Sequence, residues 1–218
     1  MTTRQWWGTI EAVAVIAVLG LNMARVAPFA TGTLLFVLPI GWLSLRLRRL
    51  TWRDVGLVWP ANGRRLVVLG LVGGVAMQAL LSLAVDPLLK MAGVRPPDVE
   101  GLTKLASGGI GGLVLTLLVG WIIGGLLEEM CFRGYLLSRV RSAIGGRRGA
   151  IIAVGLSGIY FGLSHWYQGP NGVIEAGLTG LLCGAAYVAT GGNLLLPIIL
   201  HGAVDTVGII LLAVGYTG

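Results

Sequence analysis

The chain has 218 residues, of which 56% are hydrophobic and 11% are charged, and its mean hydropathy is +0.87. In a soluble domain about a quarter of the residues are charged, so this composition excludes an ordinary soluble globular protein. The net charge of +7 comes mainly from arginines in two short segments, 46–65 and 139–148. Such clusters are typical of loops that set membrane topology. We therefore expect a membrane protein with no nucleic-acid partner.

Seven apolar segments recur along the chain, several of them reaching the roughly 20 residues that a helix needs to cross the hydrocarbon. They lie near residues 6–24, 28–45, 66–88, 108–138, 149–167, 171–190 and 193–215. Backbone polar groups must be satisfied within lipid, so these segments predict helices. The expected fold is an all-α, polytopic transmembrane bundle of about seven spans, within a range of six to eight. The first segment has no clean cleavage site after it and is interpreted as a retained helix.

The distribution of positive residues predicts the orientation. With the N-terminus inside, eleven of the 16 Lys and Arg residues fall in inner segments and four in outer loops. The basic segment 46–65 also contains Leu, Trp and Val and is expected to lie along the inner surface. The polar stretch 89–107 contains prolines and glycines and is expected to be a loop. We expect an integral multi-pass protein of the bacterial cytoplasmic membrane, in contact with lipid, with a cytoplasmic N-terminus.

Glycines four residues apart occur in three of the later spans. The pairs are Gly120/Gly124, Gly158/Gly162 and Gly180/Gly184. Small residues at this spacing let helix backbones approach closely in lipid. We divide the chain into N-terminal spans with their basic loop, 1–107, and a helical core, 108–218, in which polar groups are brought together.

Ionisable residues within spans are costly and usually mark function. After residue 107 they are Glu128, Glu129, Arg133, His165, Glu175, His201 and Asp205. Arg133 lies four residues after Glu129, on the same helical face, where the two can pair. Glu128 points roughly 100° away and is less compensated, as a general base for water requires. A structural ion pair between helices is the alternative interpretation.

Both histidines of the chain lie on later spans. His165 follows Phe161 by four residues near a span end, where an interfacial position is the alternative. His201 and Asp205 share a face of the seventh span, where an Asp can orient an imidazole; a satisfied polar couple is the alternative. One Glu and two His would also supply a donor set for zinc, although no H-E-x-x-H sequence is present. Glu175 follows a glycine-rich turn and is interpreted as interfacial.

At these residues the sequence resembles the CAAX-prenyl endopeptidase and bacteriocin-processing (CPBP/Abi) family of intramembrane proteases. The family's motifs are Glu-Glu-x-x-x-Arg, Phe-x-x-x-His and His-x-x-x-Asn/Asp on successive helices. In this chain they are Glu128-Glu129-x-x-x-Arg133, Phe161-x-x-x-His165 and His201-x-x-x-Asp205. The resemblance covers roughly residues 108–210. It implies a catalytic helical core that hydrolyses a peptide bond within or near the membrane.

The resemblance also implies roles for individual residues. Glu128 would activate the attacking water, and Glu129 with Arg133 would shape that base. His165 would assist the base or position the water. The substrate is left open, because a prenylated CAAX protein, a leader peptide or another membrane protein would all fit.

By the same resemblance, His201 and Asp205 would stabilise the oxyanion. Many relatives have Asn at the last position, and an Asp can donate a hydrogen bond only when it is protonated. The family has been described both as metal-dependent and as a metal-free, glutamate-type peptidase. We expect no cofactor, because the Glu-Arg pairing suits a water-activating base. A zinc enzyme would use Glu128, His165 and His201.

Two other classes of protein remain open. A proton- or ion-coupled transporter would use intramembrane Glu and His as a relay, but the sequence has no convincing inverted repeat. A non-catalytic immunity or scaffold protein would keep the bundle without the activity. If the chain is a peptidase, Glu128 and the two histidines should converge on one polar cavity, since a shared wet cavity relieves the cost of each group. We expect this cavity to open toward the cytoplasm.

Overall fold

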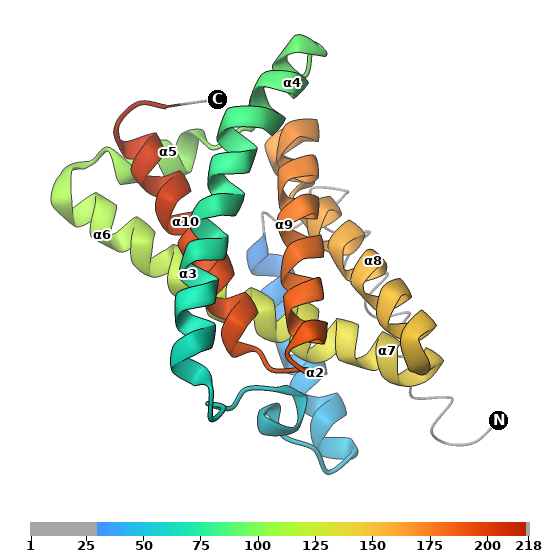
Figure 1. Ribbon diagram of the computed structural model, residues 1–218. Coiled ribbons are helices and arrows are strands. Elements are labelled where there is room, and N and C mark those ends of the chain that lie inside the picture. Colours follow the sequence, from blue (N-terminus) through green and yellow to red (C-terminus); the bar gives the residue numbers. More distant parts are fainter. Residues whose placement is uncertain (1–29, 217–218) are drawn as a thin grey trace.

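The computed structural model describes the backbone of residues 30–216, which consists of helices joined by short turns and contains no strand. The α-helices are α2 (Ala30–Leu47), α3 (Gly63–Leu80), α4 (Asp86–Met91), α5 (Glu100–Ala106), α6 (Gly109–Val119), α7 (Ser138–Ile144), α8 (Gly146–Ser164), α9 (Gly169–Ala189) and α10 (Leu195–Ala213) (Figure 1). The short 3-10 helices are η1 (Trp52–Val55) and η5 (Trp166–Gln168). The π-helices are η2 (Leu81–Val85), η3 (Gly120–Glu128) and η4 (Met130–Leu137). The predicted all-α fold class is confirmed.

Within residues 30–216, four continuous helices are long and apolar enough to cross a membrane. They are Gly63–Met91, Gly109–Ile144, Trp166–Ala189 and Leu195–Ala213, and a shorter apolar helix covers Val37–Leu47. Helix α8 corresponds to the predicted span 149–167 but is less apolar, because Arg147, Arg148 and several glycines belong to it. The predicted span 6–24 lies outside the described residues. The chain is thus an integral membrane protein, whereas the count of about seven spans is not confirmed.

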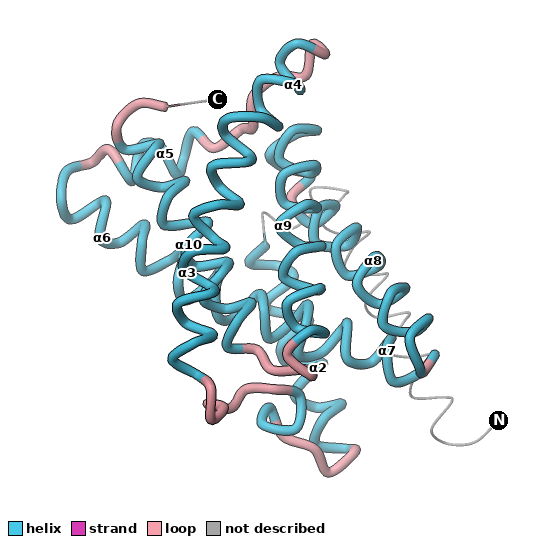
Figure 2. Tube along the Cα trace, in the orientation of Figure 1, coloured by secondary structure: helices cyan, strands magenta, loops and turns pink. Residues whose placement is uncertain are grey.

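The polar stretch 89–107 is not the single loop that the sequence predicts. Helix α3 continues through η2 into α4, which ends at Met91, and α5 forms a separate helix (Figure 2). Glu100 and Lys104 form an exposed ion pair one turn apart on α5, with 2.5 Å between Oε1 and Nζ. The hydrogen bond from Lys104 also lowers the pKa of Glu100. An ion pair at this spacing stabilises a helix, which here is short and contains Gly101.

Glycines allow the closest helix contacts in the bundle. Helix α3 packs on α10 at Gly74, where an added Cβ would lie 2.5 Å from the Ala203 side chain. Helix α8 packs on α9 at Gly158, where an added Cβ would lie 2.6 Å from Leu181, and at Gly180, where it would lie 3.1 Å from the Gly158 backbone. Side chains at these positions would push the helices apart. The close approach predicted from glycine spacing is confirmed for α8 and α9.

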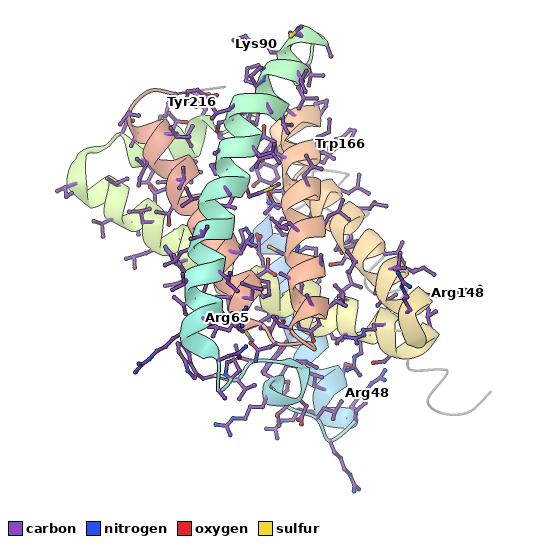
Figure 3. All side chains as sticks on the ribbon, viewed as in Figure 1. Arg48, Arg65, Lys90, Arg148, Trp166 and Tyr216 are labelled. Atoms are coloured by element: carbon purple, nitrogen blue, oxygen red, sulfur yellow. The ribbon has the colours of Figure 1, made fainter. Side chains whose placement is uncertain are left out.

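Arginines gather at one end of the bundle. Figure 3 shows Arg48, Arg65 and Arg148 toward this end, whereas Lys90 and Tyr216 lie toward the other. The basic segment 46–65 is held here by the turn between α9 and α10, because Leu194 N donates to the Gly56 carbonyl at 2.9 Å and Asn193 Nδ2 donates to the Val58 carbonyl at 2.9 Å. We refer to this as the arginine end.

Candidate active site

The candidate site lies where the π-helical part of the fourth predicted span meets α8, α9 and α10. Residues 120–128 and 130–137 follow the wider π-helical turn, a geometry that is rare and often occurs at functional sites. Glu128 ends η3, Glu129 joins the two π-helices, and Arg133 lies within η4.

A buried ion pair between Glu129 and Arg133 holds the centre of the site. Glu129 Oε1 and Arg133 Nη1 are 2.7 Å apart, and both side chains have an exposed fraction of 0%. The second guanidinium nitrogen, Nη2, donates to the Gly180 carbonyl of α9 at 2.8 Å. The guanidinium also lies 4.7 Å from the centroid of the Phe161 ring. The predicted pairing of Glu129 with Arg133 is confirmed, and it ties this helix to α8 and α9.

Glu129 also binds His201, a contact that the sequence does not predict. His201 Nδ1 lies 2.8 Å from Glu129 Oε1, the same oxygen that faces Arg133. A carboxylate next to a guanidinium accepts hydrogen bonds, so Nδ1 of His201 is the donor. This fixes the imidazole ring and leaves Nε2 pointing to the other side. Arg133, Glu129 and His201 therefore form one continuous buried chain of charge-assisted contacts.

Two further carboxyl groups face Nε2 of His201. Asp205 Oδ1 lies 3.6 Å away and Glu128 Oε2 lies 4.0 Å away. The predicted proximity of His201 and Asp205 on one face of α10 is confirmed. However, the close hydrogen bond that orients the imidazole comes from Glu129 rather than from Asp205. Asp205 and Glu128 are placed to interact with charge or with a bound group at Nε2.

His165 approaches the same place from the end of α8. Its ring centroid lies 4.8 Å from that of Phe161, as the spacing of the two residues predicts, and Phe161 lies 5.5 Å from His201 in an edge-to-face arrangement. Nδ1 of His165 lies 2.9 Å from the Phe161 carbonyl oxygen. Because a carbonyl only accepts, Nδ1 carries the hydrogen and Nε2 is an acceptor. The ring is thus held in the site rather than at an interface.

Glycines on the fourth predicted span make room for Asp205. An added Cβ on Gly120 would lie 3.1 Å from Asp205 Cβ, and one on Gly124 would contact Asp205 Oδ2 and lie 3.5 Å from His201 Nε2. At these positions any side chain would occupy the space in front of the imidazole. The glycine pair therefore shapes the site as well as the packing.

We expect Gly124→Ala to reduce activity about 100-fold while the protein stays folded, because the new methyl group displaces Asp205 and His201 from a geometry in which small shifts are costly. The measurement is peptide cleavage by purified protein, together with its melting temperature. Gly111→Ala is the matched control, since an added Cβ at Gly111 has nothing within 4 Å. Equal activity of the two variants would contradict the assigned site.

A cavity of about 490 Å³ connects these groups. Glu128, His165, His201 and Asp205 line it, whereas Glu129 and Arg133 lie behind its wall. The predicted convergence of Glu128 with both histidines is confirmed.

The same cavity extends away from the arginine end. Its lining includes Asp86, Pro97 and Tyr216, which come from the opposite end of the bundle, and Tyr216 is 37% exposed. If the arginine end is cytoplasmic, the cavity opens toward the other side of the membrane. The two expectations, a cytoplasmic arginine end and a cavity open to the cytoplasm, are therefore incompatible.

Glu175 is not the interfacial residue that the sequence predicts. It lines the cavity, where its carboxyl group lies close to that of Asp86. Asn171 Nδ2 also donates to Asp86 Oδ1, at 3.5 Å. Because Asp86 and Glu175 lie on different helices, sequence spacing gave no signal for this contact.

Glu128, His165 and His201, the side chains that a zinc enzyme would use, all line the cavity. Among the residues from 30 to 216, no group of three or more His, Cys, Asp or Glu is arranged to hold a metal ion. Nδ1 of His201 is engaged by Glu129 and Nδ1 of His165 by a backbone carbonyl, which leaves Nε2 of each ring free. Histidines that bind metals commonly make this kind of Nδ1 contact, so the imidazoles are compatible with a metal. Cys131 and Cys183 are buried free thiols, in agreement with packing roles.

The core of the chain is similar to a known protein family. Residues 110–207 match the family model described as type II CAAX prenyl endopeptidase Rce1-like. This segment is therefore similar to the Rce1-like family of CAAX prenyl endopeptidases. All three motifs of the resemblance fall within the matched residues, which include η3, η4, α8 and the first part of α10. The resemblance to CAAX-type intramembrane proteases is confirmed.

The chain is also similar to an uncharacterised 24.3 kDa protein of Escherichia coli. The two are 30% identical over 161 residues, which cover 72% of this chain and 65% of the relative. The match thus spans slightly less than two thirds of the relative's own length. No solved structure matches the chain.

Proposed function

We propose that the chain is an intramembrane endopeptidase that hydrolyses a peptide bond of a membrane-associated polypeptide by means of a water molecule activated by Glu128. One observation carries this proposal. Arg133 binds Glu129, Glu129 binds Nδ1 of His201, and Nε2 of His201 faces Glu128 in the cavity. The match of residues 110–207 to the Rce1-like endopeptidase family supports a protease role for such a site.

In this mechanism, Glu128 takes a proton from water, and the resulting hydroxide attacks the carbonyl carbon of the peptide. Nε2 of His165 accepts a hydrogen bond and is suited to orient that water, since its Nδ1 hydrogen is committed to the Phe161 carbonyl. The proton held by Glu128 then passes to the leaving amine as the carbon–nitrogen bond breaks. A free carboxylic acid and a free amine are the products.

The developing oxyanion needs positive charge. We propose that His201 supplies it as an imidazolium, donating from Nε2 while Nδ1 donates to Glu129. Asp205, 3.6 Å from Nε2, would stabilise the charged imidazole rather than donate to the oxyanion itself. This assignment removes the requirement for a protonated Asp205, which a direct donor role would impose.

We propose that water activation needs no metal, because Glu128 remains available as base while Glu129 is held by Arg133 and His201. Purified protein in lipid nanodiscs should cleave members of a membrane-peptide library, and dialysis against a chelator should leave the rate unchanged. Mass spectrometry of new peptide termini and metal analysis of the protein are the measurements. Stoichiometric zinc whose removal stops cleavage, and whose return restores it, would replace this mechanism with a metalloprotease.

We further propose that the arginine end is cytoplasmic, because positive residues are retained on that side, and that substrate enters from the opposite side. Two exposed alanines allow a test without a change of charge: Ala92 after α4 and Ala143 in α7. A membrane-impermeant maleimide should label Ala92→Cys in intact cells, and Ala143→Cys only after permeabilisation. Cys131 and Cys183 are buried and can remain. The reverse labelling pattern would place the cavity mouth in the cytoplasm.

A further inference from the structure

A second polar cluster lies on the wall of the cavity, apart from the motif residues. Asp86, at the junction of η2 and α4, is 8% exposed and lies against Glu175 and Asn171 of α9. Asp86 and Glu175 both line the cavity that contains Glu128. Asp86 and Glu175 therefore face the space that a bound substrate would occupy, whereas Asn171 contacts Asp86 without lining the cavity.

Hydrogen-bond acceptors in this cluster lack donors. Oδ1 of Asn171 and Oε1 of Glu175 are buried atoms without a hydrogen-bond partner, and Asn171 is 3% exposed. No Lys or Arg of the described chain forms an ion pair with Asp86 or Glu175. Buried acceptors are normally satisfied, so such atoms call for an explanation. The missing partner is a donor, and beside two carboxyl groups a positively charged donor fits best.

The charge of the whole cavity favours the same kind of partner. Its lining contains four carboxylic acids, Asp86, Glu128, Glu175 and Asp205, and no Lys or Arg. Lys90 lies one turn after Asp86, but its side chain is exposed at the far tip of α4 (Figure 3). Apart from the imidazole of His201, the ionisable groups that can be charged here are acidic, and an acidic wall of low dielectric attracts groups of positive charge.

We propose that Asp86, Glu175 and Asn171 form a subsite for a positively charged group of the substrate, a Lys or Arg side chain or a free α-amino group. An ammonium group has three N–H donors and no acceptor, which matches the two carboxyl groups that line the cavity and the unpartnered amide oxygen of Asn171 beside them. This inference rests on the proposed peptidase function and adds that the substrate polypeptide carries a basic group close to the bond that is cleaved.

Binding of defined peptides tests the subsite independently of cleavage. The protein would be full-length Glu128→Gln in lipid nanodiscs, and the probes two fluorescent apolar peptides that differ only by one lysine or norleucine. We expect the lysine peptide to bind at least about tenfold more tightly, in line with the loss seen when a buried charge is left unpaired. Addition of Asp86→Asn and Glu175→Gln should abolish this preference and leave norleucine-peptide binding unchanged.

Controls separate the subsite from general electrostatics and from misfolding. Glu100→Gln removes a carboxylate that is exposed on α5 and lies outside the cavity, and it should keep the lysine preference. Glu175→Gln alone retains the shape of the side chain, so it should lower the preference even if the double change unfolds the protein. Equal binding of the two peptides in the parent, or a preference that persists without both carboxylates, would overturn the subsite. Cleavage is measured separately with Glu128 intact, and its absence there would bear on the proposed peptidase function rather than on the subsite.

Discussion

Glu128→Gln is expected to reduce the rate of peptide cleavage by at least about 100-fold, because a positioned general base contributes on the order of 10²–10⁴ to the rate. The amide has the shape of the carboxylate but cannot take a proton from water. The contact of Glu128 with His201 is a 4.0 Å approach, which is too long for a hydrogen bond. The substitution should therefore leave the melting temperature close to that of the parent. The measurements are single-turnover cleavage by purified protein and thermal unfolding in the same lipid.

Glu100→Gln is the matched control for this change. It makes the same substitution on an exposed carboxylate that pairs with Lys104 on α5, outside the cavity, and should retain the parent rate. A Glu128→Gln protein that cleaves at the parent rate would remove Glu128 from the mechanism. Loss of activity together with loss of folding would instead point to a structural role for this carboxylate.

Local spacing predicted part of the site correctly. Glu129 with Arg133, Phe161 with His165, and His201 with Asp205 are each four residues apart. One helical turn brings such residues together whatever the rest of the fold does. The all-α class could also be predicted from the sequence, because the backbone polar groups of long apolar segments must form their hydrogen bonds within the segment in lipid.

Contacts between distant segments could not be predicted in this way. The bond from His201 to Glu129 joins residues 72 positions apart, and Asp86 meets Asn171 across 85 positions. Both depend on how α10 and α9 pack against their neighbours, and many packings satisfy the same apolar pattern. The helix α5 was missed for a different reason, since the prolines before it and Gly101 within it indicate a loop when the sequence is considered alone. The domain division at residue 107 stays a prediction.

Arg133→Ala is expected to cost about 3–5 kcal/mol of folding stability, because it leaves the buried carboxylate of Glu129 without its cation. Folded proteins are stable by only about 5–15 kcal/mol, so a large fall in melting temperature should accompany the change. Activity should also be lost, since Glu129 would no longer hold His201 in one position. Arg148→Ala is the control, because Arg148 is exposed at the arginine end.

A double-mutant cycle decides whether the ion pair is the cause of that instability. If Arg133 acts mainly by compensating Glu129, then Glu129→Ala in the Arg133→Ala background should recover part of the lost stability, because the stranded charge is gone. It should not recover activity, since His201 would still lack the acceptor at its Nδ1. If the two losses simply add, the role of Arg133 lies instead in its hydrogen bond to the Gly180 carbonyl and its contact with the Phe161 ring. An Arg133→Ala protein that melts like the parent would exclude both explanations, because each requires the guanidinium to hold α8 and α9 against the π-helical segment.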